Sequence, residues 1–338
     1  MKTKIYDIQK FNDQAMAHIK EAADILKKGG LVAFPTETVY GLGADALNPQ
    51  AVAAIYATKG RPSDNPMIVH VAGMDQLYEL SSLQSEVITK LTKRFWPGPL
   101  TLVLPKKEKV PDVTTGGLST IAIRMPDHPV ALELIKQSGC PIAAPSANLS
   151  GRPSPTKGDH VIEDLNGKIP MILKGGNCRV GIESTVLDLT SEIPTILRPG
   201  ILTQGDLEMV IGDKVVLDPA LDRKKHQEIL SPKAPGMKYT HYAPKAEMIV
   251  IRGNQDRVRI EIERLKKVNE EKGRIVGVIL FEEQAFRQAA HDFFAKLRLL
   301  DDQGVDLILA GALNDENPIG FAVMNRMLKS AGYHIIEV

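Results

Sequence analysis

The stretch "KGRPSDNPMIVHV", residues 59–71, passes from a charged segment through a proline-rich turn into an apolar strand. Lys59 and Arg61 supply two fixed cations, and Pro62 and Pro66 restrict the backbone between these cations and the strand. Two interpretations fit this composition: an ordinary surface loop that leads into a strand, or a rigid cradle for an anion.

Helices and strands are predicted to alternate on both sides of this stretch. Apolar residues recur at helical spacing over residues 13–28 and 49–59, and further helices are predicted over 75–95, 129–138 and 204–212. Strands are predicted at 31–43, 66–71, 171–176, 184–190 and 195–200. The runs at 100–105, 119–126 and 140–148 are short and apolar, and each is closed by a proline turn. This alternation predicts an α/β fold.

A second α/β unit is predicted after Met248. Strands at "MIVIRG", "RIVGVILF", "DLILAGAL" and "HIIEV" alternate with longer helical segments, which predicts a small Rossmann-like parallel sheet. The segment before it contains several prolines and no clean apolar period, so we predict an interdomain linker there. The predicted division is a larger domain over 1–213, a linker over 214–245 and a C-terminal domain over 246–338.

The composition excludes several classes of protein. The 338 residues carry a net charge of +1, which gives no global field for nucleic acid or a membrane. Two cysteines are too few for a disulfide framework. The N-terminus lacks the apolar stretch of a signal peptide, and no segment is apolar over the length of a transmembrane helix. We therefore expect a cytoplasmic protein.

Common catalytic motifs are missing from the sequence. It contains no P-loop, no paired His or Cys zinc motif and no G-x-S-x-G elbow, so we expect no metal held by protein side chains alone. "GLGADA", residues 41–46, matches a dinucleotide fingerprint, but the acid expected about twenty residues later is missing. We expect these glycines to form a tight turn, and an NAD(P)-dependent oxidoreductase is a less favoured alternative.

Polar residues next to prolines recur at the predicted strand ends. Ligands of α/β sheets bind at strand ends, and proline stiffens a loop before binding. Each of these residues alone is more simply a turn or cap residue. Together, however, the cations and hydroxyls suit a polyanion, as in nucleotidyl or phosphoryl transfer. They are Thr36, Thr38, Lys59, Arg61, Thr120, Arg124, Ser146, Asn148, Ser154, Ser184, Thr185 and Arg198.

Six segments in order carry a resemblance to a known family. They are "FPTETVYGLGADA", "KGRPSDNPMIVHV", "STIAIRMP", "PSANLSGRPSPT", "ESTVLDLT" and "ILRPG". The chain resembles the threonylcarbamoyl-AMP synthase family, with its YrdC-type domain and its signature of K-x-R followed by S-x-N, here residues 59–61 and 146–148. "APGMKYTHYAPKAE" resembles the linker of the two-domain form. The resemblance implies a twisted mixed α/β sheet with a concave cleft, followed by the small C-terminal domain.

The same resemblance implies a reaction. L-threonine, bicarbonate and ATP would give L-threonylcarbamoyladenylate and pyrophosphate, and the product would serve N6-threonylcarbamoyladenosine formation at adenosine 37 of tRNA. The threonine amine would form a carbamate that attacks the α-phosphorus of ATP. This chemistry needs positioning and charge neutralisation but no protein nucleophile. Mg²⁺ would bind through the ATP phosphates. Downstream tRNA threonylcarbamoyl transferase enzymes would be partners, and tRNA an indirect one.

The resemblance also implies roles for individual residues. Lys59 and Arg61 would be catalytic, and Arg124 would bind the threonine carboxylate through two parallel hydrogen bonds. Tyr239 in the linker would fold over the site as part of a lid that excludes water, and a passive tether is the alternative. ATP would contact Lys59, Arg61, Ser63, Asn65, Ser146, Asn148, Ser154, Arg198 and Tyr239, and threonine would contact Thr36, Arg61, His70, Thr120, Arg124 and Ser184.

An RNA-binding module of the same fold is the alternative from another functional class. It requires a basic stripe outside the cleft and an affinity that depends on salt. The balanced charge of the chain speaks against this as the main role. So does the position of the cations, which lie in proline-flanked loops and not along a helix face.

Overall fold

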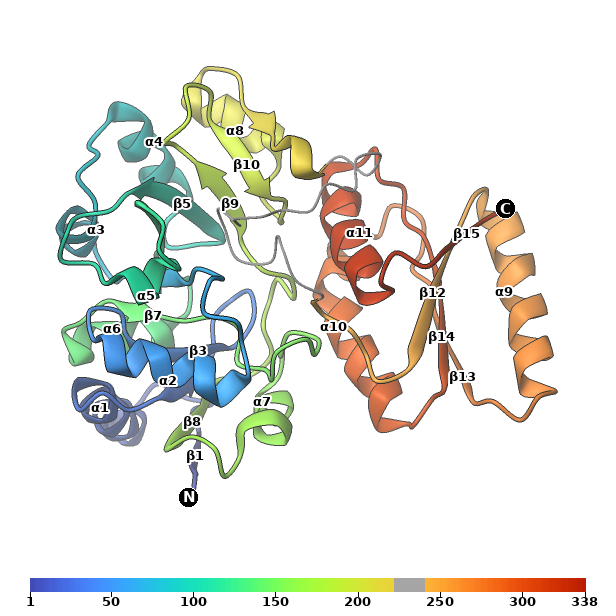
Figure 1. Ribbon diagram of the computed structural model, residues 1–338, viewed down its shortest axis with the longest axis horizontal. Helices are drawn as coiled ribbons and strands as arrows, with labels where there is room; N and C mark the ends of the chain where they lie inside the picture. Colours follow the sequence, from blue (N-terminus) through green and yellow to red (C-terminus); the bar gives the residue numbers. More distant parts are fainter. Residues whose placement is uncertain (222–240) are drawn as a thin grey trace.

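The chain folds around two sheets. The computed structural model describes residues 1–221 and 241–338, so Tyr239 and most of the predicted linker lie outside the described residues. An eleven-stranded mixed sheet forms the larger part, and a four-stranded parallel sheet forms the C-terminal part (Figure 1). The predicted combination of a mixed α/β sheet and a small parallel sheet is confirmed.

The larger sheet has the strand order β1-β8-β2-β3-β7-β4-β6-β5-β9-β10-β11. Its strands are β1 (Lys4–Asp7), β2 (Val32–Phe34), β3 (Gly41–Asp45), β4 (Ile68–His70), β5 (Leu100–Pro105), β6 (Thr120–Arg124), β7 (Ile142–Ala143), β8 (Met171–Lys174), β9 (Thr185–Asp188), β10 (Thr195–Arg198) and β11 (Val216–Leu217). The helices connected to it are α1 (Asp13–Lys27), α2 (Pro49–Lys59), α3 (Met74–Leu80), α4 (Glu86–Phe95), α5 (Asp112–Thr115), α6 (Pro129–Ser138), α7 (Gly158–Leu165) and α8 (Gln204–Ile211).

Helices cover the two faces of the larger sheet over different areas. α1 and α6 pack on each other and against Val32 and Phe34 on one face. α2, α4, α7 and α8 bury their apolar residues against the opposite face. Beyond α1 and α6, the first face carries a small apolar cluster that includes Ile68 and Ala122. His70 and Arg124 follow these residues at a spacing of two, so they point to the same face and lie at the strand ends.

The end of α2 places the K-x-R motif. Asn48 caps the helix through its side chain, and Gly60 ends it with a left-handed backbone (φ 63°). Lys59 therefore belongs to the last helical turn, whereas Arg61 begins the loop that leads to β4. The two cations contact different neighbours: Lys59 donates to the carbonyls of Ser146 and Asn148, and Arg61 donates to that of Pro66.

The glycines of "GLGADA" do not form the predicted tight turn. Gly41 and Gly43 lie inside β3, which pairs antiparallel with both β2 and β7. A Cβ atom on Gly43 would lie 2.7 Å from side-chain atoms of Phe34 and of Ile142. Glycine is therefore needed for close packing between strands. A dinucleotide fingerprint must open a helix after a strand, so this geometry removes the dinucleotide hypothesis.

The C-terminal part has parallel strands in the order β13-β14-β12-β15. α9 covers one face, and α10 and α11 cover the other, where they lie between the small sheet and the larger domain (Figure 1). Within the described ranges, none of the helices is both long and apolar enough to cross a membrane. The elements are β12 (Glu247–Arg252), α9 (Gln255–Glu270), β13 (Val276–Ile279), α10 (Phe286–Asp302), β14 (Leu307–Gly311), α11 (Pro318–Ser330) and β15 (Ile335–Glu337).

Four elements of the larger domain, β1, α5, α7 and β11, have no counterpart in the prediction. α5 and β11 span four and two residues, which is too short for an apolar period to appear. β11 pairs with β10, so the larger sheet continues beyond residue 213, where the sequence predicts the domain to end. The exact division into domains stays a prediction.

Candidate functional site

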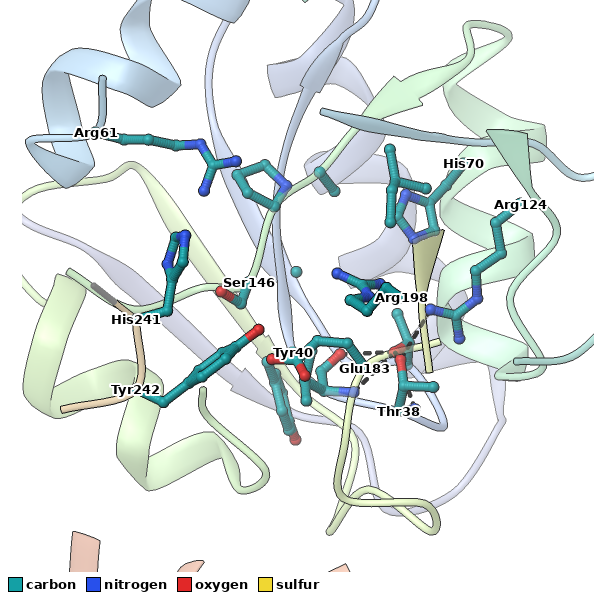
Figure 2. A pocket seen from close by; sticks show the side chains of 16 residues that line it. Thr38, Tyr40, Arg61, His70, Arg124, Ser146, Glu183, Arg198, His241 and Tyr242 are labelled. Carbon is teal, nitrogen blue, oxygen red and sulfur yellow. Dashed lines mark hydrogen bonds between the residues drawn. The ribbon is translucent and has the colours of Figure 1, made fainter. Parts of the chain in front are cut away.

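A cavity opens where the ends of β2, β4, β6 and β10 meet the loop after β7 (Figure 2). Strand ends are also where the sequence predicted the site. Side chains from distant parts of the chain converge there, including the end of the linker. The lining residues are Thr36, Thr38, Val39, Tyr40, Gly41, Arg61, Ile68, His70, Arg124, Ala144, Pro145, Ser146, Glu183, Arg198, His241 and Tyr242.

Cations are spread along the length of the cavity. Figure 2 shows Arg61 at one end, Arg124 at the other and Arg198 between them. The Arg61 guanidinium donates to the carbonyl of Pro66 at 3.2 Å. Arg198 donates from Nε and Nη2 to the carbonyl and hydroxyl of Ser184, each at 3.1 Å, and burial lowers its pKa to about 10. Three guanidinium groups around one cavity suit a ligand with several negative charges.

Arg124 is held by three neighbours. Its Nε donates to the Gly98 carbonyl at 3.1 Å, and Nη1 donates to the Thr38 hydroxyl at 2.8 Å. Its Nη2 forms an ion pair of 2.6 Å with Glu37, whose side chain is 2% exposed. Thr38 in turn bonds the Thr36 hydroxyl at 2.9 Å. The guanidinium therefore has a fixed orientation before any ligand arrives.

His70 provides a neutral ring beside this arginine. It is 4% exposed, and within the described parts of the chain its Nδ1 has no hydrogen-bond partner. Burial, together with the positive charge of Arg124, lowers the pKa of His70 to about 3. The imidazole is therefore uncharged at neutral pH and can orient a polar ligand without adding charge.

Lys59 brings the two signature motifs together. Its ammonium group donates to the carbonyls of Ser146 and Asn148, which lie 87 and 89 residues further along the chain. Burial and the nearby Arg61 lower the pKa of Lys59 well below its ordinary value, and the two carbonyl acceptors oppose this effect. Lys59 thus ties the K-x-R loop to the S-x-N loop, whereas Arg61 and Ser146 line the cavity itself.

The structure brings together only part of the predicted site. Ser154 and Ser184 bond the lining residues Glu183 and Arg198, at 2.6 Å and 3.1 Å. Thr120 begins β6, where it pairs with Pro105, and therefore lies at the opposite end of the strand from Arg124. Ser63 is exposed, and Asn65 is buried with its carbonyl next to the Arg61 guanidinium. Asn148 accepts a hydrogen bond from Lys59 through its carbonyl. Tyr239 lies outside the described residues. The predicted residues that line the cavity are Thr36, Arg61, His70, Arg124, Ser146 and Arg198.

Glu183, His241 and Tyr242 are among the lining residues that were not assigned to the site from the sequence. Glu183 stands at the start of the "ESTVLDLT" segment, where a single acid before two hydroxyls was the available signal. His241 and Tyr242 end the predicted linker, and the aromatic run "YTHY" was their signal. Tyr242 has a positive φ of 68°, which is uncommon for a residue with a side chain, and its ring lies 5.0 Å from that of Phe294. Its ring is thereby directed into the cavity.

The donor set does not resemble a metal site. Among residues 1–221 and 241–338, no group of three or more His, Cys, Asp or Glu side chains is arranged to hold a metal ion. The cavity instead collects arginines, hydroxyls and a neutral imidazole. These features define an α/β protein with a strand-end site for an anionic ligand.

Comparison with known proteins identifies this class more closely. Residues 24–200 match the family model described as "Telomere recombination", and residues 202–332 match "Threonylcarbamoyl-AMP synthase, C-terminal domain". The threonylcarbamoyl-AMP synthase of Pyrococcus abyssi is 51% identical over 95% of this chain and 96% of its own, and that of Bacillus subtilis is 46% identical over 100% of both. The chain belongs to the threonylcarbamoyl-AMP synthase family.

A solved structure agrees with this assignment over both domains. The crystal structure of P. abyssi Sua5 complexed with L-threonine superposes with a TM-score of 0.93 at 49% sequence identity. The match covers 99% of this chain and 100% of that chain. The family resemblance and the two-domain architecture predicted from the sequence are therefore confirmed.

Proposed function

We propose that this chain synthesises L-threonylcarbamoyladenylate from L-threonine, bicarbonate and ATP and releases pyrophosphate. The observation that carries this proposal is the meeting of the K-x-R and S-x-N motifs beside a cavity that contains three arginines. The name of the relatives that match over nearly the whole chain supports the same reaction. So does the complex of a relative with L-threonine.

The threonine end of the site is proposed to be the end that contains Arg124. Its guanidinium, oriented by Glu37 and Thr38, presents donors that suit a carboxylate. The neutral ring of His70 and the Thr36 hydroxyl lie on the same side. A small, polar and zwitterionic amino acid fits these partners.

ATP is proposed to occupy the opposite end. Arg61 and Arg198 would neutralise phosphate oxygens, and Ser146 would add a hydroxyl donor. Lys59 and Asn148 would support this side through the contact between the two loops. The remaining proposed ATP contacts, Ser63, Asn65, Ser154 and Tyr239, stay predictions.

The proposed reaction depends on positioning and electrostatics. The threonine amine adds to bicarbonate or CO2, and a carbamate oxygen then displaces pyrophosphate at the α-phosphorus of ATP. Arg61 and Arg198 would stabilise the charge on the leaving pyrophosphate. His241 and Tyr242 at the cavity would exclude water from the reactive anhydride. Mg²⁺ is expected as part of the ATP substrate, bound through its phosphates.

The proposal extends to the use of the product. The threonylcarbamoyl group would pass to adenosine 37 of tRNA through downstream transferase enzymes, and we propose a cytoplasmic location. Cys140 and Cys178 are both free thiols, which agrees with a reducing compartment.

Pyrophosphate release tests the reaction. Purified protein is incubated with Mg-ATP, bicarbonate and one amino acid at a time, and we expect release only with threonine or close analogues. Omission of bicarbonate is the control and should abolish the signal. Folded protein that shows no threonine-dependent release would refute the proposal. Salt-dependent binding of tRNA without any turnover would instead favour the RNA-binding alternative.

A further inference from the structure

A buried arginine of the C-terminal domain reaches the wall of the cavity. Arg326 lies on α11, its side chain is 0% exposed, and its Nε donates to the carboxylate of Glu183 at 3.1 Å. Glu183 is 143 residues away in sequence and lines the cavity. The partner of a cavity carboxylate is thus supplied by a different domain.

The same guanidinium also holds two backbone segments of the larger domain. Nη1 donates to the carbonyl of Pro199, and Nη2 donates to the carbonyl of Glu183 at 3.4 Å. Pro199 follows Arg198 at the end of β10, and Glu183 precedes Ser184 at the start of β9. Arg326 therefore fastens together the two turns that carry Arg198 and the serine to which Arg198 is bonded.

Glu183 depends on this contact for its charge. Its carboxylate is almost fully buried, and it accepts hydrogen bonds from Arg326 and from the Ser154 hydroxyl at 2.6 Å. Burial raises the pKa of Glu183, but the charges of Arg326 and Arg198 and the Ser154 hydrogen bond outweigh burial and hold it below the ordinary value. Without Arg326, the buried carboxylate would keep Arg198 and the buried amine of Lys329, whose pKa is lowered to about 7 by burial, as its nearby basic groups.

We propose that Arg326 is a positioning residue of the synthase site, which holds Arg198 toward the ATP phosphates by fastening the turns at Glu183 and Pro199. This inference rests on the proposed function, because it assigns Arg198 to the ATP side. It gives the C-terminal domain a specific task in nucleotide binding. Arg326 itself lies behind the cavity wall and does not touch substrate.

Removal of this contact should affect the two substrates differently. In Arg326→Met, Glu183 loses its Arg326 partner and would draw the Arg198 guanidinium away from the cavity. A displacement of about 1 Å can lower the rate about a hundredfold. The Arg124 end should be unaffected, because the groups that hold its guanidinium, Gly98, Glu37 and Thr38, all belong to the larger domain. We therefore expect a higher KM for ATP and an unchanged KM for threonine.

The test combines kinetics with direct binding. For the full-length wild type and Arg326→Met, we measure kcat, both KM values and the affinity for a non-hydrolysable ATP analogue by calorimetry. We expect the analogue affinity and kcat/KM for ATP to fall about tenfold or more, with the KM for threonine within about twofold. Equal nucleotide affinity in both proteins would overturn the inference. Wild-type turnover separately reports on the proposed function.

Arg298 provides a matched control. It is also 0% exposed, lies on α10 and crosses the same interface, where its Nη2 donates to Asp164 and to the Pro153 carbonyl, each at 2.7 Å. Arg298→Met should lower stability about as much as Arg326→Met while nucleotide affinity is retained. Parallel losses of affinity in both variants would show a general packing role and refute the inference.

A milder variant covers the case in which Arg326→Met does not fold. Arg326→Lys keeps the positive charge but cannot bond Glu183 and Pro199 together, because an ammonium group is a single point charge. We expect a folded protein that still binds the ATP analogue more weakly than the wild type. Wild-type affinity in Arg326→Lys would contradict the proposed fastening of the two turns.

Discussion

The two ends of the cavity hold their arginines by different means. At one end, Arg124 pairs with Glu37, and both residues belong to the same sheet and its adjoining loop. At the other, Arg198 is bonded to the Ser184 segment, which Arg326 of the C-terminal domain fastens from behind. The polar contacts that hold the first end lie within one domain, whereas those that fasten the second come from both.

This difference indicates what each domain contributes to the geometry of the site. The hydrogen bonds and the ion pair that orient Arg124 at the end proposed for threonine lie within the larger domain, although Val39 of the same loop packs into the apolar cluster of the C-terminal domain. The end proposed for ATP is fastened across the interface by Arg326, whose side chain is fully buried. Loss of Arg326 should therefore affect the nucleotide first. Four further substitutions test this difference between the two ends of the cavity.

The largest loss is expected for Arg124→Met. It leaves the carboxylate of Glu37 buried without its cation, which costs about 3–5 kcal/mol of unfolding free energy. Urea denaturation measures the loss, and threonine binding should disappear. The double variant Glu37→Gln with Arg124→Met is the control, because removal of both charges should recover much of the stability but not the binding. If the double variant regains no stability, the ion pair between Glu37 and Arg124 is coupled to further groups.

Lys59→Met should have the next largest effect. From the sequence, Lys59 is expected to contact ATP, and replacement of a side chain that only binds ligand should leave stability nearly intact. The structure shows it buried, with hydrogen bonds to two carbonyls, and their loss should cost about 2–3 kcal/mol. Lys107→Met is the control, since this exposed lysine donates to the Tyr78 carbonyl at 2.6 Å and should contribute little. Equal stability in both variants would restore the original expectation.

Acid should weaken the fold through His70. Its pKa in the folded protein is about 3, below the ordinary value of about 6.5, so the folded state binds fewer protons than the unfolded state. The associated stability is present above about pH 6.5 and is lost as the pH falls toward 3, at about 1 kcal/mol per pH unit. The pH dependence of unfolding should flatten in His70→Gln. It should be unchanged in His334→Gln, which replaces an exposed histidine.

The smallest effect on stability is expected for Arg61→Ala. Arg61 is only partly buried, and its loss should cost less than about 1 kcal/mol. Turnover should nevertheless fall about a hundredfold or more, because a guanidinium aimed at developing phosphate charge is removed. Thermal unfolding and pyrophosphate release together measure both effects. A large loss of stability with little loss of turnover would assign Arg61 to the fold and not to the site.

Local patterns in the sequence explain the part of the site that was predicted. The helix over 49–59 ends at Gly60, because glycine readily adopts the left-handed backbone that ends a helix. This places Arg61 in the loop before β4. His70 and Arg124 stand at the ends of short apolar strands, where α/β proteins bind ligands. These features depend on neighbours within a few residues, so periodicity and turn chemistry reveal them.

Contacts across the chain explain what was missed. The glycines of β3 have the composition of a turn, but they lie in a strand. The side chains of Phe34 and Ile142 leave no room there for a Cβ atom on Gly43. The single acid before two hydroxyls did not reveal the role of Glu183, because its partner lies 143 residues later in another domain. His241 and Tyr242 were assigned to the linker, yet their side chains line the cavity.

Local sequence patterns were enough to predict the alternation of helices and strands, the position of cations and hydroxyls at strand ends, and the family. Which of these groups face the cavity and which hold it together depends on how the chain packs in three dimensions. Lys59 and Arg61 are two residues apart, yet one is bonded inside the protein and the other lines the site. Their fates differ because burial and hydrogen-bond partners depend on distances in space between segments that are far apart in the chain.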